Sequence, residues 1–289
     1  MKENIIWIAS YPKSGNTLIR AFLSAYFFTN NGILNDFSSL RNIPPFNSYK
    51  NYKDIKNFPK INYFKENPEA ISKYWRLNQD LISKKLGKKV IFYKTHNAQI
   101  KHQNNYFTEK TVTKCFIYIV RDPRSVIYSS LHHYGFKNID EAVEIITSDK
   151  WLSYATENPK LLPEFILSWK THFLSWQNFY AKNKNIGIIL RFEDLVENPN
   201  KFFSLLIEFL SKKLNFKINM DKLSNSISSV NFNELSKLEK KIGFNEKSIN
   251  SKNFFRKGEV GEWENKINTK NLEKINQVFF DQLKFLNYN

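Results

Sequence analysis

Cysteine is nearly absent from this sequence, since Cys115 is the only one among 289 residues. A lone cysteine cannot close a disulfide within the chain, and it cannot build a metal site with other cysteines. A disulfide-stabilised fold and a cysteine metal cluster are therefore both excluded. Cys115 lies in an apolar run, which predicts a small buried core residue.

Long apolar runs are absent as well. No stretch reaches the roughly 18 apolar residues that a membrane-spanning helix needs. The start of the chain, MKENIIWIAS, is charged, and its apolar run is too short for a secretory signal. The sequence therefore predicts a cytoplasmic protein with no membrane span.

Acidic residues are few relative to basic ones: 27 Asp and Glu stand against 44 Lys and Arg, and the formal net charge is +17. Such a charge attracts anionic ligands, nucleic acid or acidic membranes. A codon bias towards lysine and asparagine would give the same composition. The sequence has no block of arginines and no RNA-binding aromatic signature, so nucleic acid is not an expected partner.

Hydrophobic residues are plentiful, at 42% of the chain with 26 Phe. This content is sufficient for a globular core. The length suits one large domain or two small ones. No repeat, linker or change of composition divides the chain, so we expect a single domain over residues 1–289.

The stretch from Ile5 to Phe28 has the pattern of a strand, a tight loop and a helix. Apolar residues 5–9 precede the polar loop SYPKSGNT at 10–17, and apolar residues with helical spacing follow at 18–26. The backbone N–H groups of such a loop and the helix N-terminus favour an anion. Gly15 permits close approach of the ligand, and Lys13 adds a positive charge. The loop does not match the GxxxxGK[ST] phosphate loop, and an ordinary strand–helix connection is the alternative.

Further strands are predicted at 90–94, 114–120 and 186–190. The predicted helices cover residues 67–86, 123–134, 139–147, 161–182, 200–210, 220–228, 233–241 and 270–286. This alternation predicts an α/β fold, in which a parallel β-sheet is flanked by helices. Ligands of such sheets bind beyond the carboxyl ends of the strands. The polar residues that follow the first three strands, Lys13–Thr17, Lys94–His96 and Arg121–Ser129, are therefore expected to converge.

Three separated motifs agree with one another. SYPKSGNT follows the first strand, VRDPRSVIYSS follows the strand at 114–120, and RKGEVGEW lies near the C-terminus. Across essentially the whole chain they resemble the cytosolic-type sulfotransferases that use 3′-phosphoadenosine 5′-phosphosulfate (PAPS) and release the 3′,5′-bisphosphate PAP. The resemblance implies a P-loop-like nucleotide-binding fold and sulfonate transfer to a hydroxyl or amine, with no metal required.

The resemblance also implies roles for the residues near the transferring group. His96 is the implied catalytic base, because a neutral imidazole can take a proton from a hydroxyl near neutral pH. Lys94, two residues earlier on the same strand face, would stabilise charge on the sulfonate. The implied phosphosulfate-binding residues are Lys13, Ser14, Gly15, Asn16 and Thr17, and Lys13 would also neutralise the leaving phosphate.

A second cationic pocket is implied for the 3′-phosphate. Its residues are Arg121 and Ser129 together with Arg256, Lys257 and Gly258. An arginine fork suits a phosphate dianion. The alternative for Arg121 is an ion pair with Asp122 or Glu193, and Arg124 is expected at the surface.

Several positions depart from the family pattern. Phe232 matches an adenine-stacking position, whereas Leu18 replaces a usual Trp and Phe192 replaces a Tyr that bonds an adenine nitrogen. Contacts to adenine by Phe192 and Phe232 are therefore expected to be mainly apolar. The dimerisation motif expected after Trp263 is not matched, so the sequence does not predict the oligomeric state.

The leading hypothesis is thus a PAPS-dependent sulfotransferase acting on a small molecule. The stretches 30–66, 97–110, 134–160 and 240–253 would line the acceptor pocket, and their aromatic residues suit an apolar or aromatic acceptor. A P-loop kinase is excluded, because it needs GK[ST] and acidic magnesium ligands. A non-catalytic protein that binds nucleotides, other anions or nucleic acid is the alternative, and only the net charge supports it.

Overall fold

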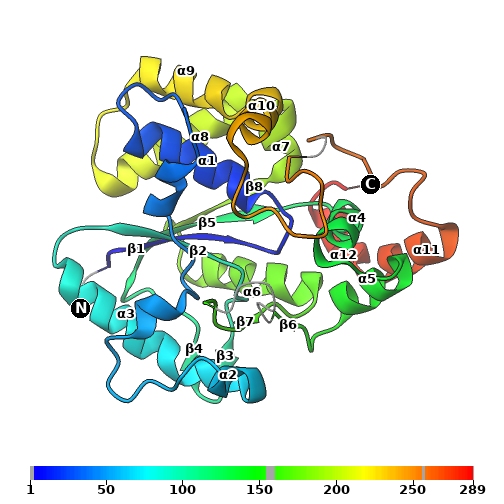
Figure 1. Cartoon of the computed structure of the whole chain (residues 1–289), viewed down its shortest axis with the longest axis horizontal. Helices are drawn as coiled ribbons and strands as arrows, with labels where there is room; N and C mark the ends of the chain where they lie inside the picture. The colour runs from blue at the N-terminus through cyan, green and yellow to red at the C-terminus, as the bar shows by residue number, and fades with distance from the viewer. Residues whose placement is uncertain (1–2, 154–159, 256–257, 289) are drawn as a thin grey trace. The chain divides into compact units, whose positions relative to one another are not determined.

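The computed structural model describes residues 3–153, 160–255 and 258–288 (Figure 1). The strands are β1 (Ile5–Ser10), β2 (Ile91–Thr95), β3 (Lys101–His102), β4 (Asn105–Tyr106), β5 (Thr113–Val120), β6 (Leu152–Ser153), β7 (Glu164–Phe165) and β8 (Gly187–Arg191). The helices are α1 (Asn16–Phe28), α2 (Tyr63–Glu66), α3 (Ser72–Leu86), α4 (Pro123–Tyr134), α5 (Ile139–Thr147), α6 (Trp169–Lys182), α7 (Phe192–Glu197), α8 (Pro199–Leu214), α9 (Met220–Ser229), α10 (Phe232–Ile242), α11 (Thr269–Val278) and α12 (Phe280–Phe285). Short 3₁₀ helices lie at Ser38–Asn42, Tyr49–Tyr52 and Pro68–Ile71.

The main sheet confirms the predicted α/β class. Its strand order is β2-β1-β5-β8, and β1 pairs with β2 in parallel from Ile5 opposite Ile91 to Ala9 opposite Thr95. Every residue of β1 is buried. A strand of a parallel sheet is covered on both faces, which is why β1 is a continuous apolar run rather than an alternating one.

The chain divides into two compact units, each built from three separate segments. The first comprises Met1–Tyr11, Ile43–Tyr118 and Ser148–Ile189, and the second comprises Pro12–Asn42, Ile119–Thr147 and Leu190–Asn289. The strands of the main sheet belong to the first unit, except for the last residues of β5 and β8. At those strand ends the chain passes into the second unit.

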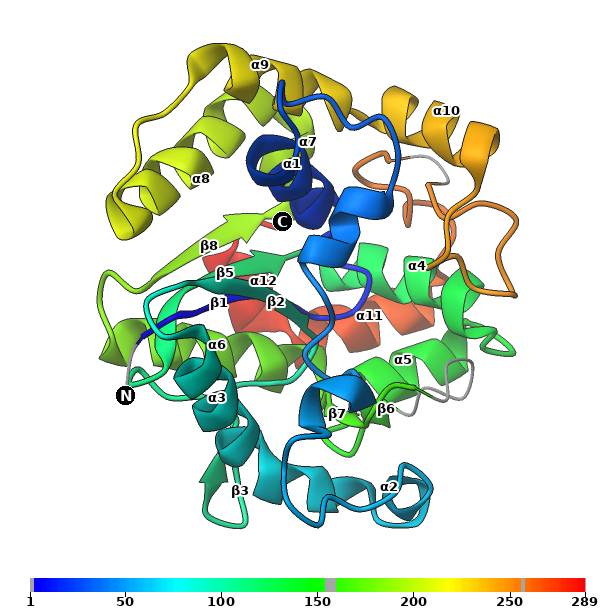
Figure 2. The same cartoon turned by 60° about the vertical axis from the view of Figure 1, so that its left-hand side comes forward.

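Aromatic side chains fill the core of the first unit. Trp7 on β1 is fully buried and meets the ring of Phe46 at 4.9 Å, while its indole N–H donates to Thr113 Oγ1. Helix α6 lies along one face of the sheet in Figures 1 and 2, and the ring of its Trp176 lies 5.2 Å from that of Phe116 on β5. Large apolar rings buried in this way supply much of the free energy of folding.

The second unit is mainly helical. Helix α9 packs against α1 and α8, and α5 packs against α4 and α11, two groupings that can be followed in Figure 2. Helix α4 begins as predicted, with Pro123 in its first turn and the Asp122 side chain accepting a hydrogen bond from Arg124 N. None of the helices in the described part of the chain is both long and apolar enough to cross a bilayer.

The helix predicted over 161–182 is wrong in its first third. Helix α6 starts only at Trp169, where the Ser168 hydroxyl accepts from Thr171 N. Before it, Leu167 has a left-handed φ of 62° and β7 pairs antiparallel with β6. Phe165, which lies within the predicted helix, is therefore buried in a strand instead.

The closing helix predicted over 270–286 is divided. Helices α11 and α12 meet at Phe279, whose φ and ψ of −108° and 13° are not helical. The short β3–β4 and β6–β7 pairs and helix α7 were not predicted. Residues 30–66, for which no long element was predicted, contain only short helices.

Candidate functional site

The SYPKSGNT loop has a backbone conformation that suits an anion site. Lys13 has a left-handed φ of 66° and Gly15 has a φ of 101° just before α1 begins at Asn16. A Cβ on residue 15 would lie 2.6 Å from Cδ2 of Phe192, so only glycine fits. Ser14 is fully buried, and its Oγ has no hydrogen-bond partner within the described residues. A buried hydroxyl without a partner destabilises the fold, and a bound anion would supply the missing partner.

Arg121 lies beside this loop in the second unit. Its guanidinium donates to the Lys13 carbonyl at 3.1 Å and stacks on the ring of Phe192 at 4.3 Å. Burial lowers the pKa of Arg121, an effect opposed by the attraction of Glu193 and other acidic groups. The structure thus brings Arg121 and the first loop together as predicted.

The two carboxylates considered as partners of Arg121 make other contacts. Glu193 accepts from Asp122 N at 3.0 Å and from the Tyr288 hydroxyl at 2.7 Å. The Asp122 carboxylate accepts hydrogen bonds from Nε and Nη2 of Arg124. The Arg124 guanidinium also donates to the Tyr288 carbonyl and stacks on the ring of Trp263 at 4.2 Å. The expectation that Arg124 lies at the surface is wrong, because it is only 7% exposed and belongs to this buried network.

The remaining nucleotide-binding candidates also lie in the second unit. Ser129 is half-buried on α4, and Phe232 is the first residue of α10. The ring of Phe232 lies against Gly258, where a Cβ would be 2.2 Å from Phe232 Cδ2 and φ is 68°. Arg256 and Lys257 fall outside the described residues. Asn16 is buried and Thr17 half-buried in the first turn of α1.

His96 follows β2 in the first unit, directly after Lys94 and Thr95. Its Nδ1 lies 2.8 Å from the carbonyl oxygen of Ser10. A carbonyl oxygen can only accept, so Nδ1 must carry the proton. In the neutral ring the lone pair is then on Nε2, the arrangement that a base acting through Nε2 requires.

Two residues that sequence reasoning missed hold the backbone of His96. The Glu164 carboxylate accepts from His96 N at 2.8 Å, and its pKa is raised because it is buried. His172 Nε2 donates to the His96 carbonyl at 3.1 Å, and its Nδ1 accepts from the Tyr118 hydroxyl at 2.8 Å. Burial lowers the pKa of His172 to about 3, so this ring is neutral. Because these partners lie 68 and 76 residues from His96 in the chain, no local pattern could have revealed them.

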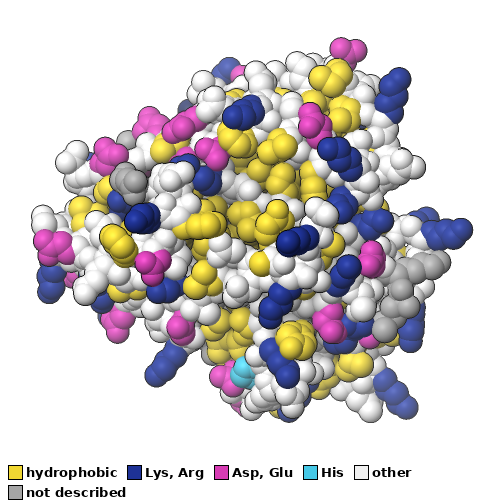
Figure 3. Space-filling model, turned by 180° about the vertical axis from the view of Figure 1, so that it is seen from behind, with side chains coloured by type: hydrophobic (Ala, Val, Ile, Leu, Met, Phe, Trp, Pro, Cys, Tyr) yellow, Lys and Arg dark blue, Asp and Glu magenta, His cyan; other side chains and the backbone are white. Residues whose placement is uncertain are grey.

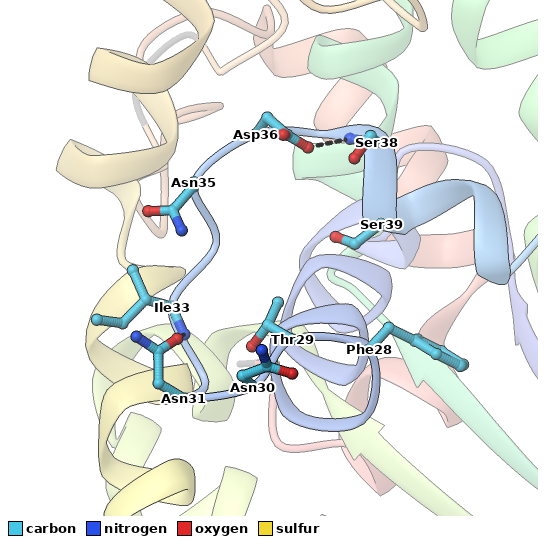
Figure 4. Close-up of a pocket in the computed structure, with 9 residues that line it drawn as sticks. All are labelled: Phe28, Thr29, Asn30, Asn31, Ile33, Asn35, Asp36, Ser38 and Ser39. Atoms are coloured by element: carbon cyan, nitrogen blue, oxygen red, sulfur yellow. Dashed lines mark hydrogen bonds between the residues drawn. The ribbon is translucent and has the colours of Figure 1, made fainter.

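A hollow of about 400 Å³ lies elsewhere in the second unit, at the C-terminal end of α1 (Figure 4). Its lining is Phe28, Thr29, Asn30, Asn31, Ile33, Asn35, Asp36, Ser38 and Ser39. The 13 residues of α1 separate it from the loop, a rise of about 20 Å. None of the predicted catalytic or nucleotide-binding residues that the structure describes lines this hollow, so it is not the anion site. Most of its lining falls instead in the stretch 30–66, which was expected to line the acceptor pocket.

Neither the charges on the face seen in Figure 3 nor the metal-binding groups of the described residues give a second candidate. Lysine and arginine side chains are spread among Asp and Glu over the face seen in Figure 3. Across residues 3–153, 160–255 and 258–288, no group of three or more His, Cys, Asp or Glu is placed to hold a metal ion.

Comparison with known proteins assigns the family. The family model described as the sulfotransferase domain matches residues 3–286. The chain belongs to this sulfotransferase family. Among curated relatives, cytosolic sulfotransferase 12 of Arabidopsis thaliana is 25% identical to this sulfotransferase over 65% of the present chain. A 3-beta-hydroxysteroid sulfotransferase of Cavia porcellus is 21% identical over 66% of the present chain. The chain spans 56% and 62% of the length of these two relatives.

Solved structures agree on the fold of this sulfotransferase. Retinol dehydratase in complex with androsterone and the inactive cofactor PAP has a TM-score of 0.64 and 18% identity, covering 98% of this chain and 82% of that one. A mouse sulfotransferase complexed with PAP has a TM-score of 0.60 and 19% identity, covering 98% and 86%. The predicted sulfotransferase fold is confirmed.

Proposed function

We propose that this protein transfers a sulfonate group from PAPS to a hydroxyl or amine of a small molecule and releases PAP. The observation that carries the proposal is the geometry of the loop in the second unit. The buried Ser14 hydroxyl and Gly15 follow Lys13, whose carbonyl accepts from the Arg121 guanidinium. The two similar solved structures that contain PAP support this nucleotide.

The loop residues fit an anionic group. Among the described residues the Ser14 hydroxyl has no hydrogen-bond partner, and a phosphate oxygen would provide one. The N–H groups at the start of α1 point in the direction that favours negative charge. PAPS supplies the sulfonate. Lys13, Ser14, Gly15, Asn16 and Thr17 bind the phosphosulfate, and Lys13 neutralises the charge on the departing phosphate. Donors already in place when charge develops are usually the largest catalytic contribution.

A second group of residues would bind the nucleoside end. Arg121 and Ser129, with Arg256, Lys257 and Gly258, bind the 3′-phosphate. The rings of Phe192 and Phe232 hold adenine through apolar contact. Because Arg121 is already desolvated, it gives up little hydration when it binds an anion.

The acceptor would be deprotonated by His96. Its Nε2 takes the proton of the acceptor hydroxyl as the new oxygen–sulfur bond forms, while Nδ1 keeps its proton on the Ser10 carbonyl. Lys94 stabilises the charge on the sulfonate. We infer that the acceptor is an apolar molecule with a hydroxyl, since solved neighbours bind androsterone and retinol.

The wider context of the enzyme follows from the same comparisons. We propose that the two units act as one sulfotransferase domain, because a single family model spans residues 3–286. We also propose a cytoplasmic enzyme, since curated relatives are named cytosolic sulfotransferases.

Thermal denaturation with nucleotides tests the proposal. We expect PAP to raise the melting temperature clearly and ATP to raise it much less, because the 3′-hydroxyl of ATP has no charge for Arg121 to bind. PAP at 100 times its Kd would stabilise the fold by about 2.7 kcal/mol, or several degrees for a chain of this size. Equal shifts with ATP and PAP would contradict the proposal.

A further inference from the structure

Glu164 makes an unusual set of hydrogen bonds for a buried acid. One oxygen, Oε1, accepts from His96 N at 2.8 Å, from Thr95 Oγ1 at 3.0 Å and from Asn97 Nδ2 at 3.5 Å. The residue is only 4% exposed. All three donors belong to the turn that carries His96, and all of these residues lie in the first unit.

The same turn is fastened to β7 by its neighbours. Phe165 N donates to Asn97 Oδ1 at 2.9 Å, and Ala98 N donates to the Phe165 carbonyl at 2.8 Å. Thr95 Oγ1 also accepts from Asn97 N at 3.0 Å. The turn therefore depends on Glu164 and Phe165 for its shape.

His96 is consequently held at three points. Glu164 binds its backbone N–H, His172 binds its backbone carbonyl, and the Ser10 carbonyl binds Nδ1 of its ring. With the backbone held on both sides, the position of the ring relative to Ser10 is set by the turn. A shift of the turn would break the Nδ1 contact and free the ring to change its tautomer.

We propose that Glu164 is a positioning residue for His96. Its carboxylate fixes the turn 95–97, so that the imidazole keeps one orientation and the Nδ1–H tautomer with its lone pair on Nε2. A buried carboxylate is costly unless donors compensate it, and here the compensating donors come from the turn itself. The proposal rests on the proposed function in one respect, which is that His96 acts as the base.

Histidine NMR on the full-length protein with PAP bound tests the positioning without any acceptor. We expect the His96 ring nitrogens, assigned by the loss of their signals in His96→Ala, to report the Nδ1–H tautomer in the wild type. Glu164→Ala should give a mixture of tautomers, because the turn loses its acceptor. Glu164→Gln should restore the wild-type spectrum, because Gln keeps an oxygen at the position of Oε1.

Turnover with labelled PAPS and a panel of phenols and alcohols gives the second readout. A base misplaced by about 1 Å can lose about 10²-fold in rate, so we expect kcat of Glu164→Ala to fall by about tenfold to 100-fold with the KM for PAPS unchanged. In the His96→Ala background the same substitution should cost nothing further. Thr113→Val is the matched control: Thr113 is a buried polar residue of the same unit that accepts from the Trp7 indole N–H at 3.2 Å, and its loss should lower stability while leaving kcat unchanged.

The outcomes separate the two proposals. A folded Glu164→Ala protein with unchanged His96 signals, or one whose kcat loss persists undiminished in the His96→Ala background, would overturn the positioning role. If Glu164→Ala does not fold, Glu164→Asp replaces it, since its shorter side chain withdraws the acceptor from His96 N; an unchanged His96 spectrum would again overturn the proposal. Wild-type turnover by His96→Ala would instead show that the base is misassigned, whatever the Glu164 variants do.

Discussion

At the scale of single residues, Arg121 is a buried cation whose guanidinium contacts a carbonyl and an aromatic ring. Such a group gains most from a phosphate dianion, because a fork of N–H donors matches two phosphate oxygens. We expect Arg121→Ala to weaken PAP binding by about 1.5–3 kcal/mol, the usual range for a hydrogen bond to a charged group. Isothermal titration measures this change. The PAP affinity of Arg121→Lys should lie between those of the wild type and Arg121→Ala. Arg41→Ala, at an exposed site, serves as the control. Unchanged affinity in Arg121→Ala would place the 3′-phosphate elsewhere.

His96 and Lys13 should respond differently to substitution. His96→Ala is expected to leave PAP affinity nearly intact while turnover falls by about 10²–10⁴, the usual contribution of a positioned base. Lys13→Ala should reduce both PAP affinity and turnover, because we propose that its ammonium binds the leaving phosphate. Calorimetry with PAP and turnover with an accepted phenol or alcohol separate the two patterns. Loss of PAP binding in His96→Ala would show that His96 belongs to the nucleotide site.

At the scale of elements, the segment before the RKG motif is attached to α1 by an ion pair. Arg20, only 2% exposed, donates to both carboxylate oxygens of Glu246 at 2.8 Å and also to the Leu40 carbonyl. Glu239 accepts from Phe254 N and Phe255 N of the same segment. Residues 246–255 are therefore held by charged groups on two helices.

Removing Glu246 should leave Arg20 buried without its carboxylate. Breaking a fully buried pair costs about 3–5 kcal/mol, and because the Glu246 side chain is 35% exposed we expect Glu246→Ala to lower the free energy of unfolding by less, about 1–3 kcal/mol. Urea denaturation measures the loss. The control is Glu234→Ala, which breaks an exposed pair with Lys237 and should cost less than about 1 kcal/mol. Equal losses in the two variants would show that the Arg20 pair contributes no more than a surface pair.

Elements with a strong local signal could be predicted from the sequence. The buried strands β1 and β5 are apolar runs, and α4 has Asp122 and Pro123 at its start. The segment 161–168 could not be predicted, because its extended form depends on pairing with β6, which local periodicity does not encode. The break at Phe279 likewise had no glycine or proline to mark it.

The candidate site divides in the same way. Lys13, Arg121 and His96 stand in recognisable motifs at strand ends, so the sequence was sufficient to select them. Glu164 and His172 form hydrogen bonds with the backbone N–H and carbonyl of His96, and a hydrogen bond to the backbone leaves no motif in the sequence. Their contribution became visible only once the tertiary contacts were known.

At the scale of the whole molecule, stability should depend on pH through His172. Burial lowers the pKa of His172 from 6.5 to about 3 in the folded state. Between these values the unfolded chain binds a proton at this residue and the folded protein does not. The contribution of His172 to stability is therefore fully present above pH 6.5, falls as the pH drops towards 3, and changes no further below that. At about 1.4 kcal/mol per pH unit, the loss over this range amounts to roughly 5 kcal/mol.

Urea denaturation of His172→Gln between pH 7 and pH 4 tests this dependence. Gln does not titrate, so the free energy of unfolding of His172→Gln should fall less steeply with decreasing pH than that of the wild type. The two slopes should differ by up to about 1.4 kcal/mol per pH unit. Tyr118→Phe is the matched control, because it removes the hydroxyl bonded to His172 Nδ1 but keeps the titrating ring; it should lower stability while retaining the wild-type slope. Glu164 has a raised pKa and acts in the opposite direction, but it is present in all three proteins and cancels from the differences. A wild-type slope in His172→Gln would show that the pKa of His172 is the same in the folded and unfolded states and is not lowered by burial.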